Sequence, residues 1–174
     1  MEVELKAKAP RGIEKKLAAA GAKKLGTVVN KDVYYDKPGE TLKKHDVTVR
    51  LRSAGGKTIL TYKSPSKSKR VKSKTEIELR VIPATELFLK GLGYTESFRK
   101  EVKRTSYSLN GVTVCYDRVK SLGTWVEFEV FGDSSARKRL VDTAALVGIP
   151  EKELTPKSYP QLIREKLKST KKQK

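Results

Sequence analysis

The sequence predicts an α+β fold, in which helices cover one face of a mainly antiparallel β-sheet. Short segments such as Glu2–Lys6 and Glu76–Val81 alternate charged and apolar side chains, a period typical of strands with one covered face. Turn signals separate these segments, and the strongest is Asn110-Gly111, the pair favoured in tight hairpins. Stretches with apolar residues at helical spacing lie between the strands and have the apolar face needed to cover the sheet.

Eight segments are predicted as strands. In chain order they are residues 1–6, 28–36, 47–52, 58–63, 76–81, 98–107, 112–119 and 124–131. Because successive side chains of a strand point to opposite faces, Arg50 and Arg52 share one face and Val49 and Leu51 the other. The alternation of the fourth segment is weak, so the pattern does not decide which way Lys63 faces.

Four segments are predicted as helices: residues 10–21, 83–93, 133–148 and 159–168. Pro10 and Pro83 suit first helical positions, Gly21 is a natural stop, and Asp133 suits an N-terminal cap. Residues 64–75 are polar and basic without periodicity. They are predicted as a loop, either a solvated connection or an anion-attracting flap beside a site.

The composition indicates a single domain over residues 1–168, followed by a basic C-terminal tail at 169–174. The formal net charge of +19 implies an anionic partner. The single cysteine, Cys115, excludes a disulfide framework. The sequence contains no apolar run long enough to span a membrane and no signal peptide. We therefore expect a cytoplasmic protein without a membrane partner.

The polar faces of the predicted strands carry both acids and bases. The acids are Glu2, Glu4, Glu76, Glu78, Asp117, Glu127 and Glu129, and the bases are Lys6, Arg50, Arg52, Lys63, Arg80, Lys100 and Arg104. Two architectures fit this pattern: an open sheet with a solvated charged face, or a barrel that is charged inside and apolar outside.

The number of acids is informative about the ligand. A surface for nucleic-acid backbone would be depleted in Asp and Glu, so the pattern disfavours a nucleic-acid partner. Carboxylates hold Mg²⁺ or Mn²⁺ through oxygen, whereas Arg and Lys hold phosphate oxygens. The mixture of both suits a complex of a divalent cation with a polyphosphate.

Glu2–Lys6 matches an ExExK signature, and further elements follow it in a recognisable order. They are Tyr35-Asp36, Val49–Arg52, Leu60–Lys63, Glu76–Glu78, Lys100 with Arg104, Asp117 before Leu122-Gly123, Trp125–Glu129 and Lys157–Tyr159. On these motifs, roughly residues 1–165 resemble the CYTH superfamily of triphosphate tunnel metalloenzymes. Within it, the chain looks most like the class IV (CyaB-type) adenylyl cyclases, and thiamine triphosphatases are more distant relatives.

The resemblance implies an eight-stranded antiparallel barrel, or tunnel, with a charged lumen and flanking helices. It implies that Glu2, Glu4, Glu127 and Glu129 are the catalytic carboxylates and, together with Asp117, the ligands of Mg²⁺ or Mn²⁺. The residues implied to bind the triphosphate are Lys6, Arg50, Arg52, Lys63, Lys100 and Arg104. Glu76 and Glu78 would line the substrate site, where they orient the bases or help to hold a second metal.

Three functions fit this site. The first is a metal-dependent adenylyl cyclase that converts ATP to cyclic AMP and pyrophosphate. The second is a triphosphatase acting on thiamine triphosphate, a nucleoside triphosphate or inorganic tripolyphosphate. The third is a non-catalytic binder of polyphosphate or nucleic acid. The resemblance also allows a homodimer, although we expect no exposed apolar stripe to support one.

Overall fold

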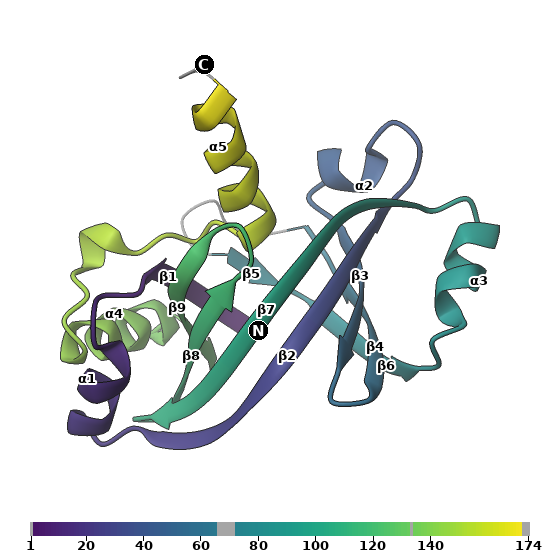
Figure 1. Cartoon of the computed structure of the whole chain (residues 1–174). Coiled ribbons are helices and arrows are strands. Elements are labelled where there is room, and N and C mark those ends of the chain that lie inside the picture. Colours follow the sequence, from purple (N-terminus) through teal and green to yellow (C-terminus); the bar gives the residue numbers. More distant parts are fainter. Residues whose placement is uncertain (1, 66–71, 133, 172–174) are drawn as a thin grey trace.

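An antiparallel sheet of nine strands dominates the computed structural model, which describes residues 2–65, 72–132 and 134–171 (Figure 1). The strands are β1 (Glu2–Lys8), β2 (Lys23–Asp36), β3 (Thr48–Ala54), β4 (Lys57–Lys63), β5 (Lys72–Lys74), β6 (Glu76–Val81), β7 (Thr95–Leu109), β8 (Val112–Val119) and β9 (Gly123–Phe131). The helices are α1 (Ile13–Ala19), α2 (Thr41–Lys44), α3 (Thr85–Gly91), α4 (Ala136–Leu146) and α5 (Tyr159–Lys171), with a short 3₁₀ turn at Glu151–Glu153.

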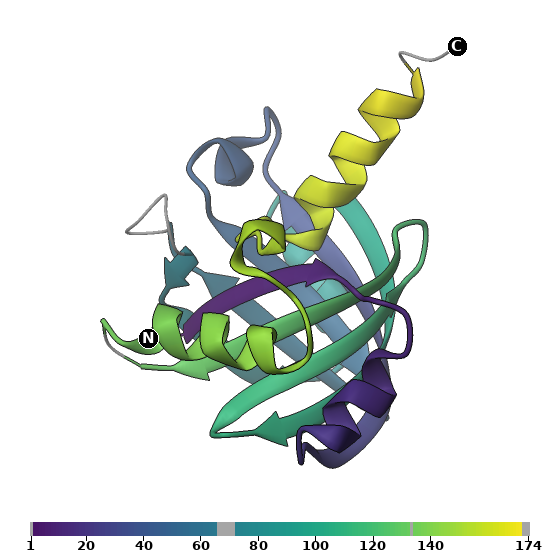
Figure 2. The same cartoon turned by 90° about the vertical axis from the view of Figure 1, so that its left-hand side faces the viewer.

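The sheet curls so that its two edges meet. Its strand order is β5-β1-β9-β8-β7-β2-β3-β4-β6, and only Thr75 separates β5 from β6. Counted as one interrupted strand, β5 and β6 reduce the sheet to eight antiparallel strands in a half-barrel, whose curvature is visible in Figure 2. The α+β tunnel predicted from the sequence is confirmed, and the open, flat sheet is excluded.

Helices cover the outer, apolar face of the sheet. Leu5 of β1 and Phe128 of β9 are buried there against Ile13 and Leu17 of α1 and Leu140 of α4. Such buried side chains each contribute about 1.5–3 kcal/mol relative to an exposed position. A smaller cluster places Leu89 of α3 against Tyr35 of β2 and Leu51 of β3. The apolar halves of the alternating strands therefore form the core, which leaves the charged halves facing inward.

The final helix closes part of the inner side. Tyr159 and Ile163 of α5 are buried with Val102, Val119 and Trp125. Beyond this contact α5 projects away from the sheet in both views (Figures 1 and 2). Since α5 runs to Lys171, the predicted boundary between residues 168 and 169 falls within a helix.

The turn at Asn110-Gly111 confirms the strongest local prediction. Both residues have positive φ, 51° and 72°, as a tight hairpin with right-handed twist requires.

The helix starts were predicted less well. Helix α1 begins at Ile13 rather than Pro10, because Gly12 has a left-handed conformation (φ 74°) that no helix interior accommodates. Asp133, the predicted cap of α4, lies outside the described residues.

Residues 72–74 correct the loop prediction for 64–75. They form β5, which pairs with Glu2–Glu4 of β1. This contact joins segments some seventy positions apart along the chain, so no local pattern announces it. Residues 66–71 of the predicted loop lie outside the described residues. The hypothesis that this loop is an anion-attracting flap therefore stays a prediction.

Among the helices of the described residues, none has the length and apolar character of a membrane-spanning segment.

Candidate active site in the lumen

A cavity of about 530 Å³ occupies the charged side of the curled sheet. Twelve of the thirteen predicted site residues line it: Glu2, Glu4, Lys6, Arg50, Arg52, Lys63, Glu76, Glu78, Lys100, Arg104, Glu127 and Glu129. Asp117 lies deeper, behind Arg104, and is fully buried. The strand alternation therefore brings together side chains that come from seven strands.

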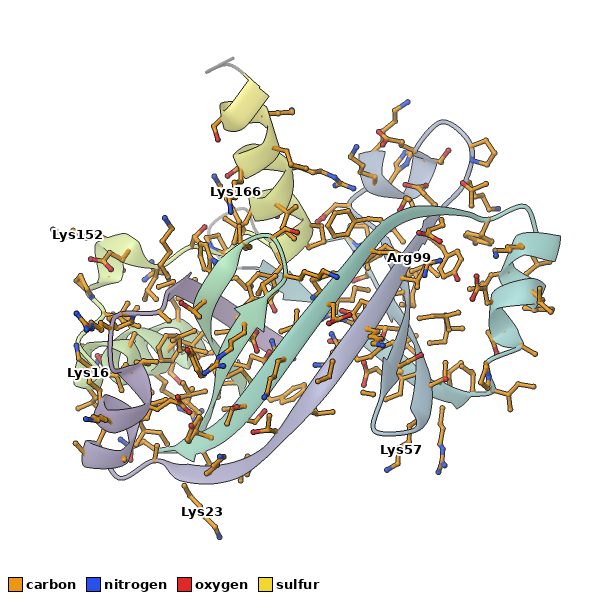
Figure 3. The ribbon with its side chains drawn as sticks, in the orientation of Figure 1. Lys16, Lys23, Lys57, Arg99, Lys152 and Lys166 are labelled. Carbon is orange, nitrogen blue, oxygen red and sulfur yellow. The ribbon has the colours of Figure 1, made fainter. Side chains whose placement is uncertain are left out.

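Acidic and basic side chains are equal in number around the lumen. Among the described residues, eight acidic and eight basic side chains line the cavity, although the whole chain has a formal charge of +19. Figure 3 shows where part of the surplus lies, since the labelled Lys16, Lys23, Lys57 and Lys152 project outward from the periphery. A balanced lumen suits a ligand that contains both a cation and an anion better than it suits a bare polyanion.

Three carboxylates form a compact group at the centre of the lumen. Glu4 of β1 is the register partner of Glu129 of β9, and Glu127 is two positions away on the same face. One oxygen from each residue lies within 4.8 Å of the others. Three hard oxygen donors at this spacing could hold a divalent cation. Glu2 lies outside this group, and its role as a ligand stays a prediction.

Lys6 and Arg104 flank the carboxylate group. The Lys6 ammonium is 3.3 Å from Glu4 and 3.1 Å from Glu127, and its side chain is almost completely buried. Arg104 pairs with Glu127 and with Glu129, the latter at 3.1 Å. Glu127 is thus shared by two cations, which fix the orientation of its carboxylate.

Asp117 orients Arg104. Its two oxygens accept hydrogen bonds from Arg104 Nε at 2.9 Å and Nη2 at 2.7 Å, the bidentate geometry that makes such pairs strong. The Tyr159 hydroxyl donates a further hydrogen bond to Asp117 at 2.7 Å. The structure does not bring Asp117 into the carboxylate group, so its role as a metal ligand stays a prediction. Tyr159, whose sequence signal was the Ser-Tyr element alone, was missed as a site residue.

Asp32 is a second residue that the sequence reasoning missed. Its carboxylate accepts hydrogen bonds from Arg52 at 2.8 and 3.0 Å, lies 3.1 Å from the Lys100 ammonium and 3.9 Å from Arg50. It therefore organises three of the six predicted triphosphate ligands. The sequence contained a pattern that could have identified it. Alternation places Asp32 and Tyr34 on one face of the strand, and Val33 and Tyr35 on the other.

Lys63 of β4 forms ion pairs with both β1 and β6, close to the two edges of the sheet. Its ammonium lies 3.2 Å from Glu2 and 2.7 Å from Glu76, which settles its orientation toward the lumen. Next to this junction, Arg50 donates a hydrogen bond to Thr61 Oγ1 at 2.9 Å, and Thr61 in turn donates one to Glu78 at 3.0 Å. The residues from β3, β4 and β6 therefore form one connected wall.

Aromatic side chains lie at one end of the cavity. Tyr34 and Phe98 contact each other with ring centroids 5.8 Å apart. The Lys100 ammonium lies 5.0 Å from the Tyr159 ring centroid, within the range of a cation–π contact. These rings could contact an organic group of a ligand beside the charged side chains of the cavity.

Charged neighbours separate the pKa values of two adjacent, largely buried carboxylates, Glu127 and Glu129. Burial raises the pKa of Glu129 to about 7; the Arg104 guanidinium opposes the rise, and the Glu127 charge adds to it. Burial also acts to raise the pKa of Glu127, but Lys6 and Arg104 together hold it well below its usual range. Glu127 is therefore ionised at neutral pH, whereas Glu129 titrates there.

Comparisons with known proteins agree with this fold. The family model described as CYTH domain matches residues 1–159. A protein of Methanocaldococcus jannaschii named "Putative adenylate cyclase MJ0240" is 23% identical over 171 residues, which cover 93% of this chain and 98% of that protein. The solved structure of the PH1012 protein from Pyrococcus horikoshii OT3 is 28% identical with a TM-score of 0.83, over 94% of this chain and 99% of that one.

A third relative, from Hippeastrum, is similar in fold. It is described as "Putative adenylyl cyclase HpAC1" with a dominant triphosphatase activity, and it is 18% identical with a TM-score of 0.73 over 95% of both chains.

Proposed function

Because this chain belongs to the CYTH domain family, we propose that it is a divalent-metal-dependent enzyme acting on a triphosphate inside its lumen. The observation that carries the proposal is the group formed by Glu4, Glu127 and Glu129, surrounded by lysine and arginine side chains in a charge-balanced cavity. The carboxylates would hold Mg²⁺ or Mn²⁺, and the cations would hold the triphosphate oxygens.

The chain's own residues supply binding and orientation. Lys6, Arg52, Lys100 and Arg104 present positive charge to the nonbridging oxygens, where charge builds up as the phosphorus–oxygen bond breaks. Asp32 and Asp117 hold two of these guanidinium groups in fixed orientations. A divalent ion in the carboxylate group would neutralise phosphate charge and lower the pKa of the attacking oxygen.

Cyclisation of ATP is the first reaction that we propose. The ribose 3′-oxygen forms a bond to the α-phosphorus, the bond from that phosphorus to the α,β-bridging oxygen breaks, and pyrophosphate leaves. The 3′-hydroxyl proton passes to solvent. The aromatic end of the cavity, with Tyr34 and Phe98, supports a substrate that carries an organic group.

Hydrolysis is the second candidate. Here a water oxygen forms a bond to the terminal phosphorus, and the β,γ-bridging oxygen leaves with the diphosphate. The same cations and carboxylates would serve both reactions. The dominant triphosphatase activity described for the Hippeastrum relative supports hydrolysis as the second candidate. The direction in which the triphosphate lies in the lumen would select one reaction.

Product analysis tests the proposal. ATP, thiamine triphosphate and inorganic tripolyphosphate are each incubated with the protein and Mg²⁺ or Mn²⁺, and chelated metal serves as the control. We expect metal-dependent turnover: cyclic AMP with pyrophosphate identifies a cyclase, and orthophosphate with a diphosphate product identifies a triphosphatase. No turnover with either metal, together with anion binding that survives Glu129→Gln, would instead establish a non-catalytic binder.

Metal affinity is expected to depend on pH through Glu129. Its pKa of about 7 means that below neutral pH the carboxyl must release a proton before it can bind a cation. Mn²⁺ should therefore bind about tenfold more weakly at pH 6 than at pH 8, as measured by isothermal titration calorimetry. Glu129→Gln should bind Mn²⁺ more weakly and lose this dependence. A wild-type affinity that is constant over this range would contradict the role of Glu129 as a ligand.

A further inference from the structure

Helices cover only parts of the outer face of the sheet. Beside α3, apolar side chains of β6 and α3 remain exposed, among them Ile77, Leu79 and Leu87. This finding corrects the expectation of no exposed apolar stripe, and the homodimer stays a prediction. Between α1 and α3, the middle parts of β2 and β7 run without a helix in front of them (Figure 1), and their outward side chains are mostly polar.

A pocket of about 300 Å³ lies on this polar strip. It is on the opposite face of the sheet from the lumen, because Lys103 and Thr105 alternate with the lumen-facing Arg104 along β7. The side chains that line it come from α1, β2, β7 and β8 and are here called the outer pocket: Glu14, Lys24, Thr27, Lys103, Thr105, Tyr116 and Arg118. The outer pocket is therefore separate from the candidate active site.

The outer pocket has an excess of positive charge. Among its described lining residues, Lys24, Lys103 and Arg118 are cations and Glu14 is the one acid. Within the described part of the chain, none of these three cations forms an ion pair. This excess differs from the lumen, where acids and bases are equal in number. An anion in the outer pocket would supply the missing counter-charge.

Two of these cations lie directly opposite each other. Lys103 of β7 is the register partner of Arg118 of β8, and like charges at such positions destabilise a sheet. On the same face, Lys31 of β2 is instead the register partner of Glu101. Because this nearby position on the strip has opposite charges, the imbalance is local to the pocket.

Hydroxyl and guanidinium groups provide hydrogen-bond donors in the same pocket. Thr27 Oγ1 and Thr105 Oγ1 lie 3.0 Å apart. Only one hydroxyl hydrogen serves this bond, so the other hydroxyl can donate to a ligand. Thr105 is 8% exposed yet lines the pocket, which places it at the base. The Arg118 guanidinium lies 5.7 Å from the Tyr116 ring centroid, a contact that orients its planar fork.

Glu14 determines which kind of oxyanion suits the pocket. Its Oε1 accepts a hydrogen bond from the Tyr107 hydroxyl at 3.2 Å, and its Oε2 has no partner among the described residues. An ionised carboxylate accepts hydrogen bonds and donates none. Glu14 can therefore accept the O–H of a monohydrogen phosphate ion, whereas it repels sulfate, which carries no proton at neutral pH.

We propose that the outer pocket binds inorganic orthophosphate as the monohydrogen phosphate ion. Lys103 and Arg118 approach the ion from two neighbouring strands, and Arg118 presents a fork that matches two phosphate oxygens. Lys24 adds a third positive charge, a threonine hydroxyl donates from the base, and Glu14 accepts the remaining proton of the ion. The proposal does not depend on which reaction the lumen carries out.

Backbone-amide NMR of the full chain tests the site, with orthophosphate added at constant ionic strength in the presence of a chelator. We expect saturable shifts at the amides of Lys103, Thr105 and Arg118. Lys103→Gln should raise the dissociation constant at least about tenfold, as expected for the loss of one charge-assisted hydrogen bond. The matched control is Lys31→Gln, an exposed lysine of the same face that has Glu101 opposite it, and it should leave the constant unchanged.

Two further variants keep the result decisive. Arg118→Gln should weaken binding as Lys103→Gln does, so the test stands if one of them fails to fold. Arg52→Ala alters the lumen and should leave the shifts at the outer pocket in place. Wild-type amides without saturable shifts, or a dissociation constant insensitive to both pocket variants, would overturn the proposal. Shifts abolished by Arg52→Ala would place the ion in the lumen and would overturn it as well.

Titration with sulfate tests the role of Glu14. The wild type should bind orthophosphate at least about tenfold more tightly than sulfate, and Glu14→Gln should bring the two affinities close together, because an amide can donate to a sulfate oxygen. Equal affinities in the wild type would reject orthophosphate as the preferred ligand. A single-stranded oligonucleotide that shifts the same amides while orthophosphate does not would reject the free ion and assign the pocket to nucleic-acid backbone.

Discussion

Replacement of Glu127 by glutamine is expected to reduce turnover by more than about 100-fold, whichever triphosphate is the substrate. Mutation of a residue that hydrogen-bonds to a metal ligand typically lowers metal affinity or activity 10- to 100-fold. Glu127 would be a ligand itself, so a larger loss is expected. Its carboxylate is nearly fully buried, paired with Lys6 and Arg104, and ionised. Glutamine keeps its shape but removes the negative charge that a divalent cation requires.

The fold should tolerate this change. Lys6 keeps Glu4 at 3.3 Å, and Arg104 keeps Asp117 and Glu129, so neither cation is left without a partner. Turnover and Mn²⁺ affinity are measured together with thermal unfolding in the presence of a chelator. Glu165→Gln, in an exposed ion pair with Lys157 at 2.9 Å, is the matched control and should leave turnover unchanged. Wild-type turnover in Glu127→Gln would contradict the metal assignment.

Replacement of Asp32 by asparagine is expected to lower the free energy of unfolding by about 3–5 kcal/mol, the usual result of removing one partner from a buried charge cluster. The Asp32 side chain is completely inaccessible, and it balances Arg52, Lys100 and Arg50. Asparagine preserves the shape but leaves Arg52 and Lys100 close together without a counter-charge from the described residues, whereas Arg50 keeps Glu78 at 3.4 Å. The same change should weaken triphosphate binding, because Arg52 loses the hydrogen bonds that orient it.

The effect of Asp32→Asn should also depend on pH in a defined direction. Burial acts to raise the pKa of Asp32, but its hydrogen bonds with Arg52 and the charges of Lys100 and Arg50 hold it below its usual range. The stability that it contributes is therefore present above about pH 4 and is lost as the pH falls further. The difference between wild type and variant in urea unfolding should be constant from about pH 6 to 8 and shrink in acid.

Asp142→Asn provides the control for this experiment. Asp142 pairs with Lys138 at 2.7 Å, but 59% of its side chain is exposed, so its loss should cost less than about 1 kcal/mol. Equal stabilities of Asp32→Asn and Asp142→Asn would show that the buried cluster contributes no more than a surface ion pair.

Local pattern determined which side chains enter the lumen. Because strand side chains alternate strictly, Glu2 and Glu4, Arg50 and Arg52, and Glu127 and Glu129 could each be assigned to one face before their strands were placed. The hairpin at Asn110-Gly111 was equally local, since its positive φ angles are a property of those two residues.

Contacts between distant segments were not predictable in this way. Asp32 is one acid in a strand that also contains Lys31, and only the fold shows that three cations from β3 and β7 converge on it. Asp117 and Tyr159 are 42 positions apart, and their hydrogen bond exists because α5 closes the lumen. Segment 72–74 lacks any strand pattern and becomes a strand only because β1 presents an unpaired edge to it.

The sequence alone determined the two faces of the sheet and the chemistry of each face, because alternation is a property of consecutive residues. Only the tertiary structure decided which acid pairs with which base. It also decided that the edges of the sheet meet at Thr75 and that the apolar side chains Ile77 and Leu79 of β6 are exposed. Pairing and coverage depend on the curvature and order of the strands, which emerge from the packing of the whole chain rather than from any stretch of it.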